Sequence, residues 1–169
     1  MKFLYAPWRN KYATSITEAK KETTQESACV FCTINKEKDH DREHFVLRRF
    51  NHHYIMFNRY PYNAGHLLVI SYKHTGLLEE LTQEARAELM ELTTKSLSIL
   101  KQQINADGFN VGLNLGKAGG AGIPSHLHVH VLPRFIGDTN FLPTIGETKQ
   151  ISFDLNKIYE QLKPEFDRL

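Results

Sequence analysis

Three histidines alternate with apolar residues late in the chain, in the run His126-Leu127-His128-Val129-His130-Val131-Leu132. Successive side chains of a β-strand point to opposite faces, so the three imidazoles would share one face and the apolar residues the other. At a rise of about 3.3 Å per residue, neighbouring histidines would stand roughly 6–7 Å apart. A neutral imidazole is a competent nucleophile near neutral pH and also a metal ligand. The run therefore predicts nucleophilic catalysis or metal ligation on a half-buried strand.

A glycine-rich loop lies directly before this run, with four glycines between residues 116 and 122 and Ser125 at its end. Glycines let backbone N–H groups approach an anion closely. A metal site on a single strand usually needs a further histidine or carboxylate, which this segment does not supply. The loop and the histidines together favour chemistry on an anionic substrate.

The two cysteines of the chain, Cys29 and Cys32, are separated by two residues. This spacing is half of a typical zinc site, and it is also found in redox pairs. Two reduced, buried cysteines would give the same pattern. No thioredoxin-like βαβ pattern surrounds the pair, which disfavours the redox interpretation. A zinc site and a pair of buried thiols both stay open from the spacing alone.

The elements that would position these residues predict an α+β domain. One long helix is expected over residues 82–104, with Thr82 as its N-cap and Glu84 in its first turn. A final helix is expected over 153–162 and a polar loop over 14–27. Strands are expected over 45–49, 54–58, 66–70, 110–115 and 126–132. Strands on both sides of a long helix indicate an antiparallel sheet of about five strands, with helices covering one face.

A chain of 169 residues fits one domain. We expect an N-terminal extension over 1–28, a core over 29–135 and a tail with a helix over 136–169. Hydrophobic residues make up 41% and charged residues 24%, and the net charge is only +2, which argues against nucleic acid or a membrane surface as a partner. No apolar stretch is long enough for a signal peptide or a membrane span, so a cytoplasmic protein is expected.

The histidine run matches the pattern His-φ-His-φ-His-φ-φ, with φ apolar, without a gap, and the chain resembles the histidine triad (HIT) superfamily. Residues 58–70 (NRYPYNAGHLLVI) resemble the turn and strand of that family, and residues 110–116 resemble its penultimate strand. Residues 6–9 (APWR) and 133–141 (PRFIGDTNF) resemble the bacterial branch that includes diadenosine tetraphosphate hydrolases and phosphorylases. The resemblance covers most of the chain and implies a HIT-like α+β fold.

The resemblance implies that His128 attacks the α-phosphate of a nucleotide and forms a nucleotidyl-histidine intermediate. His130 would then hydrogen-bond phosphate oxygens, His126 would orient its neighbours, and Ser125 would donate to a phosphate oxygen or the leaving group. Many relatives carry a Gln-Ser or Gln-Thr pair before the triad, whereas this chain has Gly122-Ile123-Pro124-Ser125, so only Ser125 offers a hydroxyl.

The leading function is hydrolysis of a dinucleoside polyphosphate such as diadenosine tetraphosphate. Phosphorolysis of the same substrate is the nearest alternative, and the two differ in whether water or phosphate resolves the intermediate. A nucleotide-binding module with incidental turnover is a further alternative. A metal-dependent enzyme built on alternating histidines is the last, and it predicts that chelators abolish activity.

By the same resemblance, Asn58 would contact the ribose and Asn114 a phosphate. An apolar pocket for the base could draw on four residues, each of which also fits an ordinary core position. These four residues are Phe31, Ile34, Met56 and Leu68. His66 is a weaker candidate for supporting the nucleotide site or the core.

Relatives with a CxxC pair complete a zinc site with two histidines. One is the first histidine of the triad, and the other follows the strand that corresponds to residues 66–70 of this chain. The implied ligands are Cys29, Cys32, His74 and His126, and four such ligands make the zinc structural rather than catalytic. No organic cofactor is implied, and relatives commonly form homodimers. The other histidines are expected on the surface or in a turn. They are His40 and His44, expected to be solvated, and His52 and His53, expected in a turn.

Overall fold

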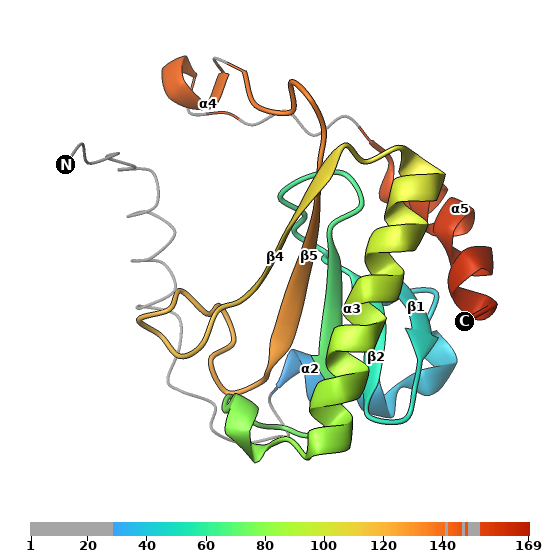
Figure 1. The fold of residues 1–169 in the computed structure, drawn as a ribbon, viewed down its shortest axis with the longest axis vertical. Coiled ribbons are helices and arrows are strands. Elements are labelled where there is room, and N and C mark those ends of the chain that lie inside the picture. The colour runs from blue at the N-terminus through green and yellow to red at the C-terminus, as the bar shows by residue number, and fades with distance from the viewer. Residues whose placement is uncertain (1–28, 141, 147, 149–152) are drawn as a thin grey trace.

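The computed structural model describes residues 29–140, 142–146, 148 and 153–169, and these residues form a sheet with helices on both faces (Figure 1). The five strands are antiparallel and run in the order β1-β2-β3-β5-β4. Their bounds are β1 (Val46–Arg49), β2 (His53–Phe57), β3 (Leu67–Ser71), β4 (Gly108–Leu113) and β5 (His128–Arg134). The predicted α+β fold, with an antiparallel sheet of about five strands and one long helix, is confirmed.

The long helix begins where its sequence predicts. The hydroxyl oxygen of Thr82 accepts a hydrogen bond from Ala85 N at 3.2 Å, and the helix ends at Asn105, whose φ is 52°. The predicted polar loop over 14–27 lies outside the described residues. The helices are α2 (Val30–Lys36), α3 (Gln83–Ile104), α4 (Leu142–Ile145) and α5 (Leu155–Asp167), with short 3-10 turns η2 (Lys38–His40) and η3 (Leu78–Glu80).

Two apolar layers cover the two faces of the sheet. Helices α3 and α5 pack on one face, α3 against β5 and β3 and α5 against β1. The buried cluster of this layer includes Leu127, Val129 and Val131 of the histidine segment. Helix α2 packs on the opposite face, where Tyr54 and Ile70 belong to a second buried cluster. The two helices that the sequence predicts, α3 and α5, do cover one face, and α2, which the sequence did not predict, covers the other. The strands are apolar on both faces, so the second face also needs cover, and α2 is too short to give a clear helical period.

Several boundaries differ from the predicted ones. Strand β5 begins at His128 instead of His126, and the backbone N–H of Leu127 donates to Thr75 O at 2.7 Å in the preceding loop. Helix α5 is longer than predicted, and Asp154 caps it by accepting from Asn156 N at 2.8 Å. The turn assignment is wrong for His53, which is the fully buried first residue of β2. Among the described residues, no helix combines the length and apolarity that crossing a membrane requires.

Candidate active site and metal centre

The three histidines point to the face of the sheet that α2 covers. Pairing of β3 with β5 places Leu68 opposite His130 and Ile70 opposite His128, and both apolar residues belong to the cluster around α2. The ring of Phe31, on α2, lies 5.3 Å from the His126 ring and 5.1 Å from the His128 ring, measured between centroids. His126 and His128 are buried, so the row lies under α2 instead of on an open face.

The hydrogen bonds of His128 leave one ring nitrogen available for attack. Its Nδ1 lies 2.8 Å from the carbonyl oxygen of His126. A carbonyl only accepts, so Nδ1 carries the proton and Nε2 keeps its lone pair. Burial lowers the pKa of His128 and outweighs the opposing effect of this hydrogen bond. The ring is therefore neutral at neutral pH, which is the state that a nucleophile needs.

A chain of hydrogen bonds also sets the tautomer of His130. The backbone N–H of Tyr62 donates to His66 Nδ1 at 3.1 Å, so the proton of His66 is on Nε2. That N–H donates to His130 Nδ1 at 2.9 Å, which leaves the proton of His130 on its own Nε2. Burial, with a smaller contribution from His128, lowers the pKa of His130 to about 4. His130 thus presents a neutral N–H donor beside the lone pair of His128.

Four residues bring their ligand atoms together at the start of the histidine row. The Sγ atoms of Cys29 and Cys32 and ring nitrogens of His74 and His126 all lie within 4.8 Å of one another. His126 Nδ1 lies 3.3 Å from Cys29 Sγ, 3.5 Å from Cys32 Sγ and 3.3 Å from His74 Nδ1. A tetrahedral ion with bonds of about 2.3 Å to sulfur and about 2.0 Å to nitrogen would separate S from N by about 3.5 Å and N from N by about 3.3 Å. The four residues therefore fit a tetrahedral metal site.

The neighbours of His126 orient it toward this cluster. Its Nε2 donates to the carbonyl oxygen of Ser71 at 2.7 Å, so the lone pair of Nδ1 points toward the two sulfur atoms and His74. The same residue offers its backbone carbonyl to His128. Both cysteines lie at the beginning of α2 and are not joined in a disulfide, and His74 follows β3. A bound ion would hold α2 against the residues that precede β5.

The residues predicted to bind substrate lie in three different environments. Four of them are buried in the cluster around α2: Phe31, Ile34, Met56 and Leu68. Asn58 accepts from Tyr60 N at 2.9 Å, and its Nδ2 lies 3.4 Å from His66 Nδ1. Asn114 and Ser125 are partly exposed in the segment between β4 and β5. Their roles in binding stay predictions.

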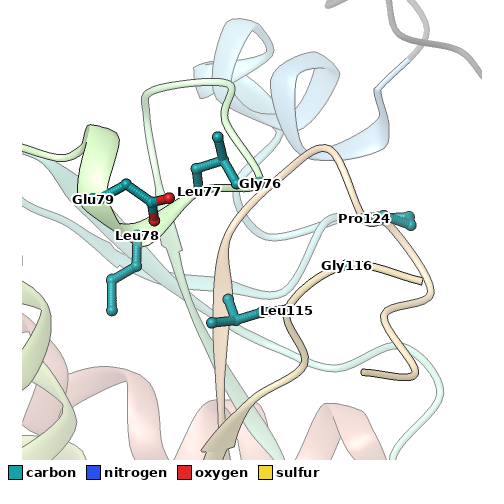
Figure 2. A pocket seen from close by; sticks show the side chains of 7 residues that line it. All are labelled: Gly76, Leu77, Leu78, Glu79, Leu115, Gly116 and Pro124. Atoms are coloured by element: carbon teal, nitrogen blue, oxygen red, sulfur yellow. The ribbon is translucent and has the colours of Figure 1, made fainter. Parts of the chain in front are cut away.

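An apolar cavity of about 520 Å³ lies beside the loop that precedes the histidine row (Figure 2). Figure 2 shows the segment Gly76 to Glu79 facing Leu115, Gly116 and Pro124 across it. None of the four residues predicted for the base pocket is among its seven lining residues. This cavity is consequently separate from the apolar cluster around α2.

Sequence reasoning missed Tyr62 and ranked His66 too low. The ring of Tyr62 stacks on that of His130 at 5.9 Å and 17°, and it lies 4.7 Å from the ring of His66. His66 is fully buried and bonded to His130. The pairing of Leu68 with His130 places His66 on the same face as the histidine row. Only the register between β3 and β5 could have indicated that His66 lies beside His130.

The comparison with protein families agrees with this geometry. A family model described as the HIT domain matches residues 39–137, which is more than half of the chain. The chain belongs to the HIT domain family. The matched residues include His128 and His130, and the HIT signature therefore coincides with the row of histidines beneath α2.

Individual HIT proteins resemble the chain to different extents. A Mycobacterium tuberculosis protein named AP-4-A phosphorylase is 44% identical over 128 residues, which are 76% of this chain and 66% of that protein. A Saccharomyces cerevisiae bis(5'-adenosyl)-triphosphatase is 30% identical over 91 residues, 53% of this chain and 44% of that one. The structure of a zinc-bound histidine triad family protein from Mycobacterium smegmatis has a TM-score of 0.68 at 24% identity, covering 85% of this chain and 96% of that one. The chain thus spans about two thirds of the length of the mycobacterial phosphorylase.

Proposed function

We propose that this HIT protein cleaves dinucleoside polyphosphates of the diadenosine tetraphosphate type through a nucleotidyl-histidine intermediate on His128. Nε2 of His128 attacks the α-phosphorus, an N–P bond forms, and the P–O bond to the remaining nucleotide breaks. His130 donates its Nε2–H to a phosphate oxygen and stabilises the charge that develops there. An acceptor then attacks the same phosphorus and releases His128.

The observation that carries this proposal is the pair of complementary tautomers. His128 is held with a free lone pair by the His126 carbonyl, and His130 is held as a donor by His66. The two rings lie 5.0 Å apart between centroids, close enough to act on one phosphate group. Both rings are neutral near pH 7, so nucleophile and donor are available together.

Two acceptors are candidates. Sequence reasoning favours water, which would give AMP and ATP from diadenosine tetraphosphate. The name of the 44% identical mycobacterial relative favours inorganic phosphate, which would give ADP and ATP. We take phosphorolysis as the leading candidate, because that relative is the more similar one and the yeast triphosphatase matches a smaller part of the chain.

The test is incubation of the purified protein with diadenosine tetraphosphate, with and without phosphate, and separation of the products by mass. ADP plus ATP that appear only with phosphate support phosphorolysis, whereas AMP plus ATP without phosphate support hydrolysis. His128→Ala should lose at least about 10⁴-fold in turnover, as expected when a covalent nucleophile is removed. His40→Ala is the matched control, because His40 is exposed and, among the described residues, its ring hydrogen-bonds to Glu43 on the surface. Turnover by His128→Ala near the wild-type rate would contradict the proposal.

We further propose that Cys29, Cys32, His74 and His126 bind a structural zinc ion. Two thiolates and two imidazoles are a common tetrahedral zinc set and leave no position open for substrate. The zinc-bound histidine triad family protein from M. smegmatis shares the fold. Elemental analysis of protein purified without added metal should give about one zinc per chain. A zinc-free protein with unchanged stability would contradict this assignment.

We also propose that the protein is cytoplasmic and that it forms a homodimer through β4. β4 lies at an edge of the sheet, and Val111 on it is 46% exposed. Within the described residues no further strand pairs with the outer side of β4, and an open sheet edge favours pairing with a second copy. Sedimentation should give the mass of two chains, and Val111→Lys should shift that equilibrium toward one chain.

A further inference from the structure

The turn after β5 contains a buried carboxylate. Asp138 Oδ2 accepts from Arg134 Nε at 2.7 Å and from Phe135 N at 3.1 Å, and its Oδ1 accepts from Arg134 Nη2 at 2.8 Å. Gly137, whose φ is +81°, permits the turn that brings Asp138 back to Arg134. Only 6% of the Asp138 side chain is exposed. Hydrogen bonds that Asp138 accepts thus hold the turn that contains Gly137 and Asp138 to Arg134, at the end of β5.

Asn63 joins this carboxylate to another segment of the chain. The Nδ2 group of Asn63 donates to Asp138 Oδ2 at 2.7 Å and to the carbonyl oxygen of Pro133 at 3.1 Å. Its own backbone carbonyl accepts from His66 N at 3.3 Å. Asn63 is buried, and both hydrogens of its amide are used. The loop between β2 and β3 is therefore held to the turn after β5 through one side chain.

The same loop orients His130. Tyr62, next to Asn63, donates its backbone N–H to His66 Nδ1, and His66 Nε2 then donates to His130 Nδ1. A shift of this loop would weaken the first bond, and the longer contact of Asn58 Nδ2 with His66 Nδ1, at 3.4 Å, would hold the tautomer of His66 less firmly. The donor that fixes His130 would then be less well defined. The geometry of His130 consequently depends on the position of Asn63.

We propose that Asp138 is a positioning residue for His130, acting through Asn63 and His66. The proposal rests on the nucleotidyl transfer proposed above, for which His130 is the phosphate donor. A carboxylate suits the place because every group that faces it is a donor: Arg134, Asn63, the Phe135 amide and the Thr139 hydroxyl. An amide would turn one of its own N–H groups toward these donors and would release either Arg134 or Asn63.

Asp138→Asn is the variant that tests the role, and Asp107→Asn is its control. Asp107 anchors the same turn by accepting from Ile136 N at 2.8 Å, but within the described part of the chain its side chain does not hydrogen-bond to Asn63 or to the loop that carries it. A role limited to holding the turn would give both variants the same activity. We expect kcat of Asp138→Asn to fall about 10-fold or more, because the phosphate donor is misplaced, with KM changed by less than about 2-fold. Asp107→Asn should keep kcat within about 2-fold.

A second readout does not depend on turnover. Ring ¹⁵N chemical shifts of His130 report which nitrogen carries the proton, and the wild-type ring should be the Nε2–H tautomer. In Asp138→Asn the His130 signals should move toward a mixture of tautomers, and in Asp107→Asn they should stay in place. Asn63→Ser, which removes the linking amide, provides the same test if Asp138→Asn does not fold.

The outcomes separate the two proposals. Wild-type protein without nucleotidyl transfer would overturn the proposed function, while the ring shifts would still decide whether Asp138 orients His130. Equal losses of kcat in Asp138→Asn and Asp107→Asn would overturn the positioning role, as would unchanged His130 shifts in the folded Asp138→Asn and Asn63→Ser variants.

Discussion

Replacement of His130 by Asn should make the stability of the protein less dependent on pH. The Asn Oδ1 can accept from His66 as His130 Nδ1 does, so the hydrogen bond is kept while the titrating group is lost. His130 is the suitable group because its pKa falls from an ordinary value of 6.5 to about 4 in the folded protein, chiefly through burial. Its ring faces His66, His128 and Tyr62, and no carboxylate is among these ring neighbours.

The direction and size of the effect follow from these two pKa values. Below pH 6.5 the unfolded chain binds a proton at His130 that the folded protein excludes until about pH 4, so stability falls as the pH falls through this window. At 1.36 kcal/mol per pKa unit, the difference between pH 7 and pH 5 is about 2 kcal/mol. The other histidines contribute to both proteins and cancel in the comparison.

Urea unfolding followed by circular dichroism at pH 7 and pH 5 measures this difference. The free energy of unfolding of the wild type should fall by about 2 kcal/mol more than that of His130→Asn, with equal m-values. Equal losses in the two proteins would refute the argument, because they would mean that His130 takes up a proton in the folded state as readily as in the unfolded one.

Three further predictions concern residues other than His128 and His130. Cys32→Ser should abolish stoichiometric zinc in elemental analysis and lower the free energy of unfolding, measured in urea, by several kcal/mol. If the wild-type protein binds no metal, a chelator would leave its free energy of unfolding unchanged, which would contradict this prediction. Gly76→Ala should cost about 1–3 kcal/mol in urea unfolding, since its Cβ would clash with the carbonyl oxygen of Pro124; an unchanged midpoint would contradict this close approach. Glu88→Ala should lower stability by about 2 kcal/mol in the same assay, because the buried ring of His53 loses its partner at 2.9 Å; a neutral effect would mean that water replaces the carboxylate.

Much of the fold could be predicted because its signals are local. Alternation of His and apolar residues predicts which side chains of β5 share a face, and Leu127 and Val129 do lie in the core beneath α3. Thr82 caps the long helix through a bond to a residue three positions away, so a short stretch of sequence suffices. Helix α2 could not be predicted in this way, because seven residues give too few turns for a clear period.

The sequence by itself determined the family, the nucleophile candidate and the types of the four candidate metal ligands, since these depend on residue types at short, fixed spacings. Only the tertiary structure decided how they act together. His126 orients His128 through its carbonyl and faces two cysteines 94 and 97 positions away in the chain. His66 reaches His130 across the β3–β5 pairing, and Asn63 reaches Asp138 over 75 positions. Such contacts depend on strand register and loop packing, which form only when the whole sheet is assembled and which no local pattern encodes.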